Sequence, residues 1–267
     1  MSGQAEPVTP DLHALLGDFK TDLWLPRYGP GTAGAWSLRQ FPMFSTRGYW
    51  GDLYNVRGCL MLYGPPGQNN ELTSWMSISP LEIESQEAGI RAACGHAVVV
   101  GLGMGWLAAN VALNPEVQAV TIVESDPQVI AFASAHGVFA QLPENARGKI
   151  DIVQADAFEW KPRAAADCLL VDIWPALLDT RKLDDARRIQ RNVGAAAIHY
   201  WGQEADMWRI ARRSGINEAD FDRATLEHIV VKAIGLPLIL SGEADYVAKI
   251  AQGARWWGGG AEDWWRD

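Results

Sequence analysis

The chain has 267 residues, which is enough for one well-buried α/β domain with additions but short for two large independent domains. Hydrophobic residues make up 48% and charged residues 21%, the balance of an ordinary globular protein. A net charge of -9 repels nucleic acid phosphates and anionic membranes, so we expect neither as a partner. The basic group Arg187, Arg188 and Arg191 is typical of the solvated face of a helix.

Neither targeting nor metal binding is indicated by the sequence. The first ten residues lack the basic region and apolar stretch of a signal peptide, and no segment has the apolar length of a membrane span. The cysteines Cys59, Cys94 and Cys168 occur singly, without the pairing of a metal site. We therefore expect a cytoplasmic protein with buried, reduced thiols and no bound metal.

The N-terminal third is expected to lead the chain into a larger core. Residues 11–19 have a short helical pattern. Residues 56–63 and 72–79 are strand-like, and the turn formers GPPGQNN between them predict a β-hairpin. Ser79, Pro80 and Glu82 then form a capping box with proline at the first helical position, which predicts a helix to about residue 94.

Between His96 and Tyr200, strand-like and helix-like segments alternate. Continuous apolar strands separated by amphipathic helices predict a parallel sheet covered on both faces. The predicted strands are residues 97–101, 119–124, 149–155, 167–173 and 195–201, and the clearest helices are 106–113 and 128–137. Ligands of such sheets bind at the carboxyl ends of the strands, which here carry Gly101, Glu124, Asp156, Asp172 and Tyr200.

Beyond Gln203 the pattern is helical again, with Asn217 and Ser241 as expected caps of the last helices. The tail, residues 255–267, is rich in tryptophan and glycine. Its tryptophan pairs are expected either to fold over the site as a lid or to pack against a second subunit in a homodimer. The expected parts are an N-terminal helix and hairpin region, residues 1–95, a core, residues 96–203, and a helical extension, residues 204–267.

The loop Gly101-Leu102-Gly103-Met104-Gly105-Trp106 follows the first core strand. Glycines let the backbone approach a ligand closely, and the next helix offers it free N–H groups and a positive dipole end. A dinucleotide fingerprint has glycine at position 106, where this chain has tryptophan. The loop alone fits either a nucleotide site or a tight structural turn.

The acids at the next two strand ends favour one cofactor. Glu124 lies 23 positions after Gly101, where a carboxylate can bind both ribose hydroxyls of either NAD or S-adenosylmethionine. Asp156 ends the third strand and is followed by small and apolar residues, which suits hydrogen bonding to an adenine amino group and packing on its ring. An NAD fold has no requirement for an acid there. Asp156 is also a common type of helix cap, but the three strand ends together favour S-adenosylmethionine.

Four segments resemble, in order, the motifs of class I S-adenosylmethionine-dependent methyltransferases: VVVGLGMGW, VTIVESDPQVIAFA, DIVQADAFEW and DCLLVDIW. They are most similar to the spermidine synthase-like branch, in which apolar residues precede the first glycine, as Val98 to Val100 do. The likeness covers about the middle 110 residues. It implies an α/β fold with a Rossmann-like parallel sheet and helices on both faces, preceded by the β-hairpin region and followed by the helical extension.

The resemblance also implies roles for individual residues. The loop glycines would surround the methionine part, Glu124 would hold the ribose, Asp156 and Ala157 would meet the adenine, and Asp172 would lie near the sulfonium and the amine. The expected cofactor-binding residues are Gly101, Leu102, Gly103, Met104, Gly105, Glu124, Ser125, Asp156, Ala157 and Asp172.

Two departures bear on the reaction. Aminopropyltransferases of this branch place acids where this chain has Met104 and Pro175. Methyl transfer requires less, because positioning alone can contribute about 7 to 11 kcal/mol and a base is needed only for a protonated nucleophile. The leading interpretation is a methyltransferase acting on a small molecule. An aminopropyltransferase and a non-catalytic S-adenosylmethionine-binding protein are the alternatives.

Asp172, Trp174 and His199 are the candidate catalytic residues on the acceptor side. Aromatic faces can hold a planar or cationic acceptor, and histidine can take a proton near neutral pH. Strand alternation, however, sends His199 and Trp201 to one face and Tyr200 to the other. His199 and Trp174 are therefore either site residues or ordinary packing residues.

Overall fold

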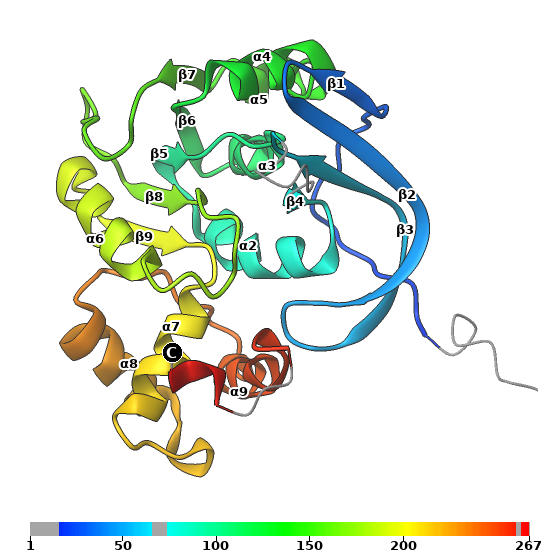
Figure 1. The fold of residues 1–267 in the computed structure, drawn as a ribbon. Helices are drawn as coiled ribbons and strands as arrows, with labels where there is room; N and C mark the ends of the chain where they lie inside the picture. The colour runs from blue at the N-terminus through cyan, green and yellow to red at the C-terminus, as the bar shows by residue number, and fades with distance from the viewer. Residues whose placement is uncertain (1–15, 66–73, 260–262, 267) are drawn as a thin grey trace, which may run out of the picture.

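The structure is a computed structural model that describes residues 16–65, 74–259 and 263–266. A five-stranded parallel sheet lies at its centre, a four-stranded antiparallel sheet stands beside it, and the C-terminal helices gather below the parallel sheet in Figure 1. The predicted fold class, a helix-covered parallel sheet with a β-hairpin region before it and a helical extension after it, is confirmed.

The central sheet has the strand order β7-β6-β5-β8-β9, and all its strand pairs are parallel. Its strands are β5 (Gly95–Val100), β6 (Val117–Glu124), β7 (Ile150–Gln154), β8 (Cys168–Val171) and β9 (Ala197–Tyr200). Val100 pairs with Val123 on one side and Val171 on the other, so these strands end level with one another. The order switches beside β5, which is where open α/β sheets bind ligands.

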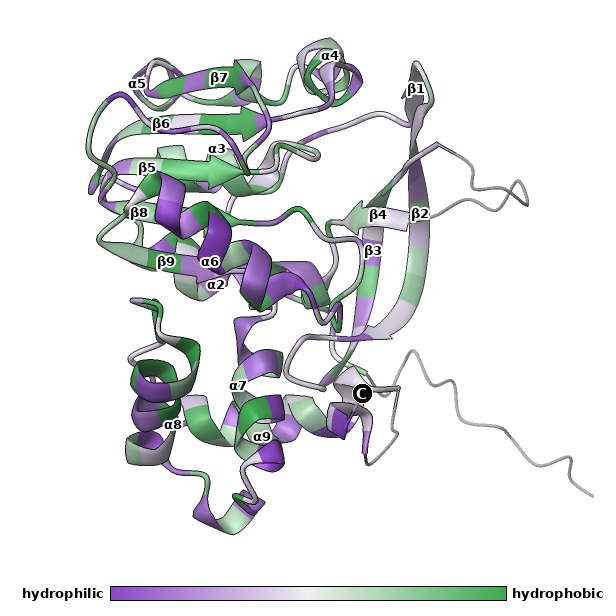
Figure 2. Cartoon of the chain, turned by 60° about the vertical axis from the view of Figure 1, so that its left-hand side comes forward, coloured by the Kyte–Doolittle hydropathy of each residue, from purple (hydrophilic) through white to green (hydrophobic). Residues whose placement is uncertain are grey.

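Each face of the sheet has its own hydrophobic core, because successive side chains of a strand point to opposite faces. Ala97 and Val99 of β5 join one core, and Val98 and Val100 join the other. The first core includes α2 (Pro80–Ala92), α3 (Trp106–Leu113), α4 (Pro127–His136) and α5 (Glu144–Arg147). The second includes α6 (Lys182–Val193), α7 (Gln203–Arg213), α8 (Arg223–Ile229) and α9 (Tyr246–Trp257). Figure 2 shows apolar colour along β5 and β6, between these cores.

The antiparallel sheet has the order β1-β2-β3-β4. Its strands are β1 (Gly31–Ala33), β2 (Trp36–Arg47), β3 (Leu53–Tyr63) and β4 (Ser74–Ser77). The predicted hairpin is confirmed as β3 and β4, although most of its turn lies outside the described residues. The sequence did not indicate β2, because the strand is half exposed and contains Pro42, so it shows no continuous apolar run.

Helix α2 begins at Pro80 as predicted, but the predicted capping box is wrong. The Ser79 side chain makes no cap bond and is instead 2.8 Å from the Ser77 hydroxyl. Glu82 is only 4% exposed and shares a hydrogen bond with Asp172 at the end of β8. The carboxyl group therefore interacts with the end of β8 rather than with the start of its own helix.

The N-terminal helical prediction, residues 11–19, falls partly outside the described residues. Residues 16–19 are not helical, because their backbone pairs with β3 instead. The Phe19 N–H donates to the Asn55 carbonyl, and the Asn55 N–H donates to the Gly17 carbonyl, both at 2.9 Å. Pairing with a strand gives these backbone groups the partners that a helix would have given.

The C-terminal helices are confirmed, but their caps differ from the prediction. Asp222 caps α8 by accepting a hydrogen bond from the Thr225 N–H, while Asn217 precedes a short 3₁₀ turn (Glu218–Asp220). Asp245 occupies the cap position of α9, and the Ser241 hydroxyl accepts from a backbone N–H in the loop before it. The remaining turns are 3₁₀ segments Phe139–Gln141 and Trp264–Arg266 and a π turn, Val230–Ile234.

The described tail residues pack against the chain itself. The Trp257 indole donates to the Tyr49 carbonyl at 2.7 Å, and the Trp264 indole donates to the Ala254 carbonyl at 2.8 Å. Described residues between 205 and 265 also contribute to the second core of the parallel sheet. The extension thus shares its core with the sheet, and the division into three parts stays a prediction.

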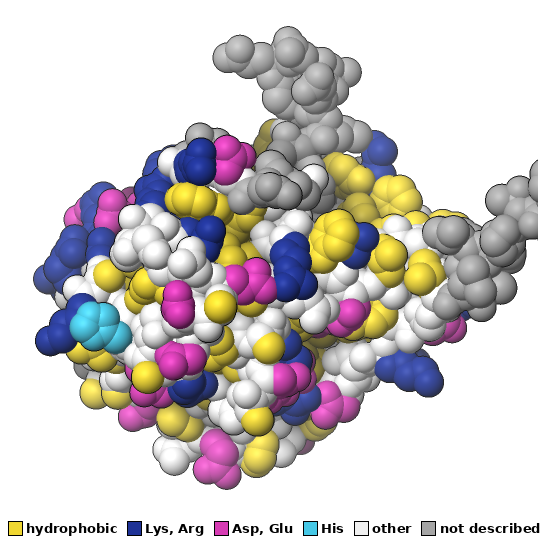
Figure 3. All heavy atoms as spheres, turned by 90° about the horizontal axis from the view of Figure 1, so that it is seen from below, with side chains coloured by type: hydrophobic (Ala, Val, Ile, Leu, Met, Phe, Trp, Pro, Cys, Tyr) yellow, Lys and Arg dark blue, Asp and Glu magenta, His cyan; other side chains and the backbone are white. Residues whose placement is uncertain are grey.

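The surface shows mixed charges, with acidic and basic side chains interspersed on the face in Figure 3. On α6, Arg187 pairs with Asp184 and Arg188 pairs with Glu159, as expected for a solvated helix face. None of the helices in the described ranges has the length and apolar composition of a membrane span. Cys59 and Cys168 are buried as predicted, whereas Cys94 is exposed because it lies in the short connection between α2 and β5.

Candidate functional site

A cavity of about 350 Å³ opens at the carboxyl ends of β5, β6, β7 and β8. This volume lies within the range of small-molecule sites, and the position is where α/β sheets bind their ligands. Seven of the ten predicted cofactor-binding residues line it: Gly101, Gly103, Glu124, Ser125, Asp156, Ala157 and Asp172. The parallel sheet thus brings most of the predicted residues to one place.

The glycine loop lies against neighbouring strands so closely that side chains would not fit. A Cβ atom on Gly101, whose φ is +95°, would lie 2.0 Å from the Asp172 carbonyl oxygen. A Cβ atom on Gly103, whose φ is +48°, would lie 2.3 Å from the sulfur of Met76 on β4. Glycine at these two positions therefore lets the loop backbone lie close to the end of β8 and to the antiparallel sheet.

Leu102, Met104 and Gly105 do not line the cavity, although they were predicted to bind the cofactor. The side chains of Leu102 and Met104 are buried in the core on the other side of the loop. The Met104 carbonyl accepts a hydrogen bond from the Tyr28 hydroxyl, and Gly105 occupies the cap position of α3 in a left-handed conformation. Alternate loop residues point away from the cavity and anchor the loop.

Glu124 connects the end of β6 to the glycine loop. Its Oε2 accepts from the Leu102 N–H at 2.9 Å, and its Oε1 accepts from the Asp126 N–H at 2.8 Å. Both backbone donors fix the orientation of the carboxylate at the cavity wall. Each oxygen keeps a further lone pair, so the carboxylate can still accept hydrogen bonds from a diol.

Asp126, Trp36 and Trp75 also line the cavity and were not predicted. Asp126 caps α4, and its Oδ2 accepts from the Trp36 indole at 3.2 Å. The Trp36 and Trp75 rings meet edge to face with centroids 5.6 Å apart. Asp126 before Pro127 is a recognisable helix start, but the tryptophans come from the antiparallel sheet, whose position over the cavity has no local sequence signal.

The turn after β7 carries Asp156 at its exposed corner. Its Oδ1 accepts from the Phe158 N–H at 2.9 Å, and Ala157 is buried beneath it. The second carboxylate oxygen, Oδ2, remains available to a ligand. Asp156 therefore both orders its turn and lines the cavity.

The cavity is strongly acidic. Glu124, Asp126, Asp156 and Asp172 all line it, and its described lining includes no lysine, arginine or histidine. No three His, Cys, Asp or Glu residues of the described ranges are grouped as a metal site. The arrangement favours a neutral or cationic ligand, because a buried phosphate would have no positive partner.

Asp172 lies between the cavity and helix α2. Its Oδ2 accepts from the Gln86 side-chain amide at 3.0 Å, and it shares a second hydrogen bond with Glu82. Burial raises the pKa of Asp172 from 3.8 to about 6. Burial and the neighbouring Asp172 charge raise the pKa of Glu82 well above 4.5. No local pattern indicated that Glu82 is a neighbour of Asp172, because its position in the chain suggested a helix cap.

These raised pKa values predict a pH-dependent stability. The folded protein holds the Asp172 proton more tightly than the unfolded chain does. The protonated group therefore contributes its full share of the free energy of unfolding below about pH 4, and this contribution is lost as the pH rises through about 6. We expect Asp172→Asn to raise the free energy of unfolding by about 1 to 3 kcal/mol at pH 7. The gain should vanish near pH 4 in urea unfolding experiments. A destabilised variant at pH 7 would show that the carboxylate supports the fold instead.

His199 and Trp174 do not reach the cavity. The wholly buried His199 ring packs against Gly89 of α2, and its Nε2 lies 3.1 Å from the Ser85 carbonyl. The Trp201 indole donates to the Ser85 hydroxyl, whereas the Tyr200 hydroxyl donates to Asp206. The predicted alternation of faces is confirmed. The structure does not place His199 in the cavity that Asp172 lines.

Trp174 is 4% exposed, and its indole donates to Asp185 Oδ2 at 2.9 Å. We expect Trp174→Phe to lower the free energy of unfolding by about 1 kcal/mol through loss of this hydrogen bond. The affinity for S-adenosylmethionine should stay within about threefold of wild type. Calorimetry would measure both quantities. A larger loss of affinity at unchanged stability would return Trp174 to the binding site.

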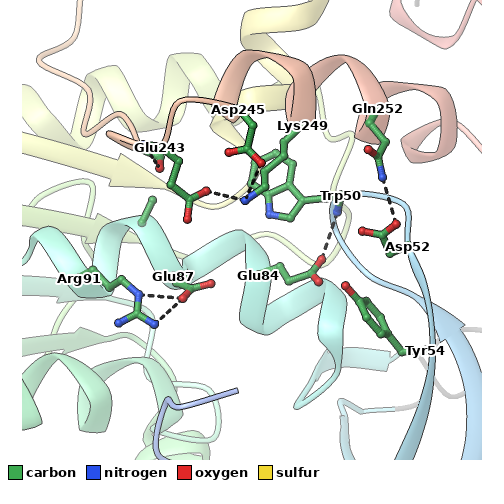
Figure 4. A pocket seen from close by; sticks show the side chains of 12 residues that line it. Trp50, Asp52, Tyr54, Glu84, Glu87, Arg91, Glu243, Asp245, Lys249 and Gln252 are labelled. Atoms are coloured by element: carbon green, nitrogen blue, oxygen red, sulfur yellow. Dashed lines mark hydrogen bonds and ion pairs between the residues drawn. The ribbon is translucent and has the colours of Figure 1, made fainter. Parts of the chain in front are cut away.

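A second cavity of about 460 Å³ lies between the β2–β3 turn, α2 and α9 (Figure 4). Five carboxylates and two cations line it, and both cations are paired: Lys249 with Glu243 and Asp245, and Arg91 with Glu87. It lies away from the carboxyl ends of the parallel strands, whose residues do not line it. The cavity at the strand ends is therefore the candidate site.

No family model matches the sequence, and no curated protein matches it either. Among solved structures, the chain is similar to a DhpI–SAH complex, with 20% identity over 42% of this chain and 51% of DhpI, at a TM-score of 0.32. It is similar to the glycopeptide N-methyltransferase MtfA complexed with S-adenosyl-L-methionine, with 22% identity over 41% of this chain and 43% of MtfA, at a TM-score of 0.33. The methyltransferase domain of bacterial CtHen1 is 15% identical over 50% of this chain and 86% of that domain, at a TM-score of 0.36. The chain thus spans about half the length of DhpI and less than half of MtfA.

Proposed function

We propose that the chain is an S-adenosylmethionine-dependent methyltransferase acting on a small molecule, with its cofactor in the cavity at the strand ends. The observation that carries this proposal is the set of carboxylates around the cavity. Glu124, Asp156 and Asp172 lie at the ends of three parallel strands. Beside them is the glycine loop, in which Gly101 and Gly103 have no room for a side chain. Each has a free lone pair for a hydroxyl or an ammonium group.

The charge of the cavity distinguishes between nucleotide cofactors. NAD carries a pyrophosphate, which needs positive partners or free backbone N–H groups. Four carboxylates line this cavity, and the Leu102 N–H of the loop is already bonded to Glu124. S-adenosylmethionine carries two positive charges, on its sulfonium and ammonium groups, and one negative charge, on its carboxylate. The acidic lining therefore supports S-adenosylmethionine over NAD.

The proposed placement follows from chemistry. Glu124 would accept hydrogen bonds from the ribose hydroxyls, and Asp156 would accept one from the adenine amino group. Asp172 would face the positively charged end of the cofactor. The described lining contains no histidine that could act as a base. The protein would then act on an acceptor by binding, orientation and exclusion of water, which suffices when the nucleophile has a free lone pair.

Two alternatives remain within the proposal, and both keep the same cofactor site. An aminopropyltransferase of the spermidine synthase-like branch would need acids where this chain has the buried Met104 and the exposed Pro175. A non-catalytic protein would bind the cofactor without turnover. A homodimer and a cytoplasmic location belong to the same proposal, and neither is required by the chemistry.

The experiment is to incubate the protein with methyl-labelled S-adenosylmethionine and a metabolite extract, and to follow the label and the by-product by mass spectrometry. A labelled small molecule with equimolar S-adenosylhomocysteine supports the methyltransferase. Putrescine with decarboxylated S-adenosylmethionine tests the first alternative, and spermidine formation would overturn methyl transfer. Binding without any product would favour the non-catalytic protein.

Trp75 offers a test of the antiparallel sheet as part of the site, because it lines the cavity and is 38% exposed. We expect Trp75→Ala to weaken S-adenosylmethionine binding by about 2- to 13-fold, the effect of an aromatic contact worth about 0.5 to 1.5 kcal/mol. Trp256→Ala is the control, since Trp256 is similarly exposed at 42% but lies outside the cavity. Equal effects of the two changes in calorimetry would exclude Trp75 from the site.

A further inference from the structure

Glu82 is a buried neighbour of Asp172. It occupies the first turn of α2, is 4% exposed, and does not line the cavity. Gln86, one turn later, is 1% exposed and donates its side-chain amide to Asp172 Oδ2 at 3.0 Å. One face of α2 therefore presents two buried polar side chains to a single carboxylate.

Glu82 lies one turn before Gln86 on α2 and is close enough to Asp172 to share a hydrogen bond with it. Such a bond requires a proton, because two ionised carboxylates have only acceptors. Two adjacent buried carboxyl groups cannot both ionise without a large cost. Glu82 is the more enclosed of the two, whereas Asp172 reaches the cavity. The proton is therefore favoured on Glu82 and the negative charge on Asp172.

We propose that Glu82 is a positioning residue that keeps this proton and donates it to Asp172, so that Asp172 faces the cavity as one oriented negative charge for the positive end of the ligand. The inference deepens the proposed function and rests on it for the identity of the ligand. The pair would make the site select a cation, and the two bonds from α2 would hold the carboxylate in one orientation.

Other charged groups around the pair leave this assignment in place. The Lys182 ammonium lowers the pKa of Asp172, which favours the charge on Asp172. Burial lowers the pKa of His199, which packs against the same helix, so this ring stays neutral at pH 7. The Glu204 charge opposes this lowering of the His199 pKa. Glu124 lies on the wall of the cavity that Asp172 also lines. Within the described residues these groups add no second proton donor to Asp172.

The first arm of the test needs no ligand. Carbon NMR of protein labelled at glutamate side chains should show one carboxyl resonance at the neutral-acid position at pH 7, absent from Glu82→Gln. In Asp172→Asn the same resonance should titrate at lower pH, because the neighbouring charge is removed. A Glu82 resonance that is ionised at pH 7 in wild type would overturn the inference, whether or not the protein binds S-adenosylmethionine.

The second arm compares S-adenosylmethionine with S-adenosylhomocysteine, which lacks the sulfonium charge, by calorimetry at pH 7. Glu82→Gln keeps a donor without an exchangeable acid proton and should retain the affinity for S-adenosylmethionine within about threefold. Glu82→Ala removes the donor and should weaken it by about tenfold or more, with a smaller change for S-adenosylhomocysteine. Equal losses for both ligands, or an equal loss in both variants, would overturn the inference. Absence of binding by the wild type would instead refute the proposed function.

Discussion

Glu124→Ala is expected to lower the affinity for S-adenosylmethionine by about 10- to 150-fold, the effect of losing charged hydrogen bonds worth about 1.5 to 3 kcal/mol. The change removes the proposed acceptor of the ribose hydroxyls. It also frees the Leu102 and Asp126 N–H groups, which the carboxylate now holds at 2.9 and 2.8 Å. Isothermal titration calorimetry on a folded variant measures the loss.

Glu116→Ala is the matched control, because Glu116 is exposed and precedes β6 at the opposite end of the same strand. Its affinity should equal that of wild type. Glu124→Gln separates the two roles, since glutamine keeps one acceptor oxygen but presents an amide to the other backbone donor. An unchanged dissociation constant in Glu124→Ala would remove Glu124 from the site.

Gly101→Ala is expected to destabilise the fold by about 3 kcal/mol or more. The new Cβ would lie 2.0 Å from the Asp172 carbonyl, so the ends of β5 and β8 would have to separate. The φ of +95° adds strain for any residue with a side chain. Because the displaced backbone forms the cavity wall, binding of S-adenosylmethionine should be lost as well.

Gly194→Ala isolates the conformational part of this effect. Gly194 has a φ of +66° at the end of α6, and a Cβ there would meet nothing within 4 Å. Its cost should be about 1 to 2 kcal/mol, with unchanged ligand affinity. Equal destabilisation of the two variants in chemical unfolding would contradict the steric account of the glycine loop.

The parallel sheet could be predicted because its signals are local. The strands are mostly apolar, and Gly101, Glu124, Asp156 and Asp172 lie at or just beyond their carboxyl ends. Parallel strands bring their carboxyl ends to one edge of the sheet, so residues at successive strand ends could be predicted to lie close together. The side chain of Met104 lies in the core, because the sequence pattern does not show which loop side chains turn away from the cavity.

The residues that the sequence did not reveal depend on contacts between distant segments. Trp36 reaches the cavity from a strand that precedes the core, 90 positions away from its partner Asp126. Glu82 has the spacing of a helix cap, and only the approach of α2 to β8 makes it a partner of Asp172. His199 could have faced the site or the core, and its burial against Gly89 decides for packing.

Binding of S-adenosylmethionine at the strand ends is tested most directly by a calorimetric titration of the wild-type protein at pH 7, repeated with NAD. We expect saturable binding of one S-adenosylmethionine per chain, displaced by S-adenosylhomocysteine. We expect no binding of NAD, because four carboxylates and no described cationic side chain line the cavity. Binding of NAD, or no heat from S-adenosylmethionine up to about 1 mM, a standard free energy weaker than about -4 kcal/mol, would contradict it.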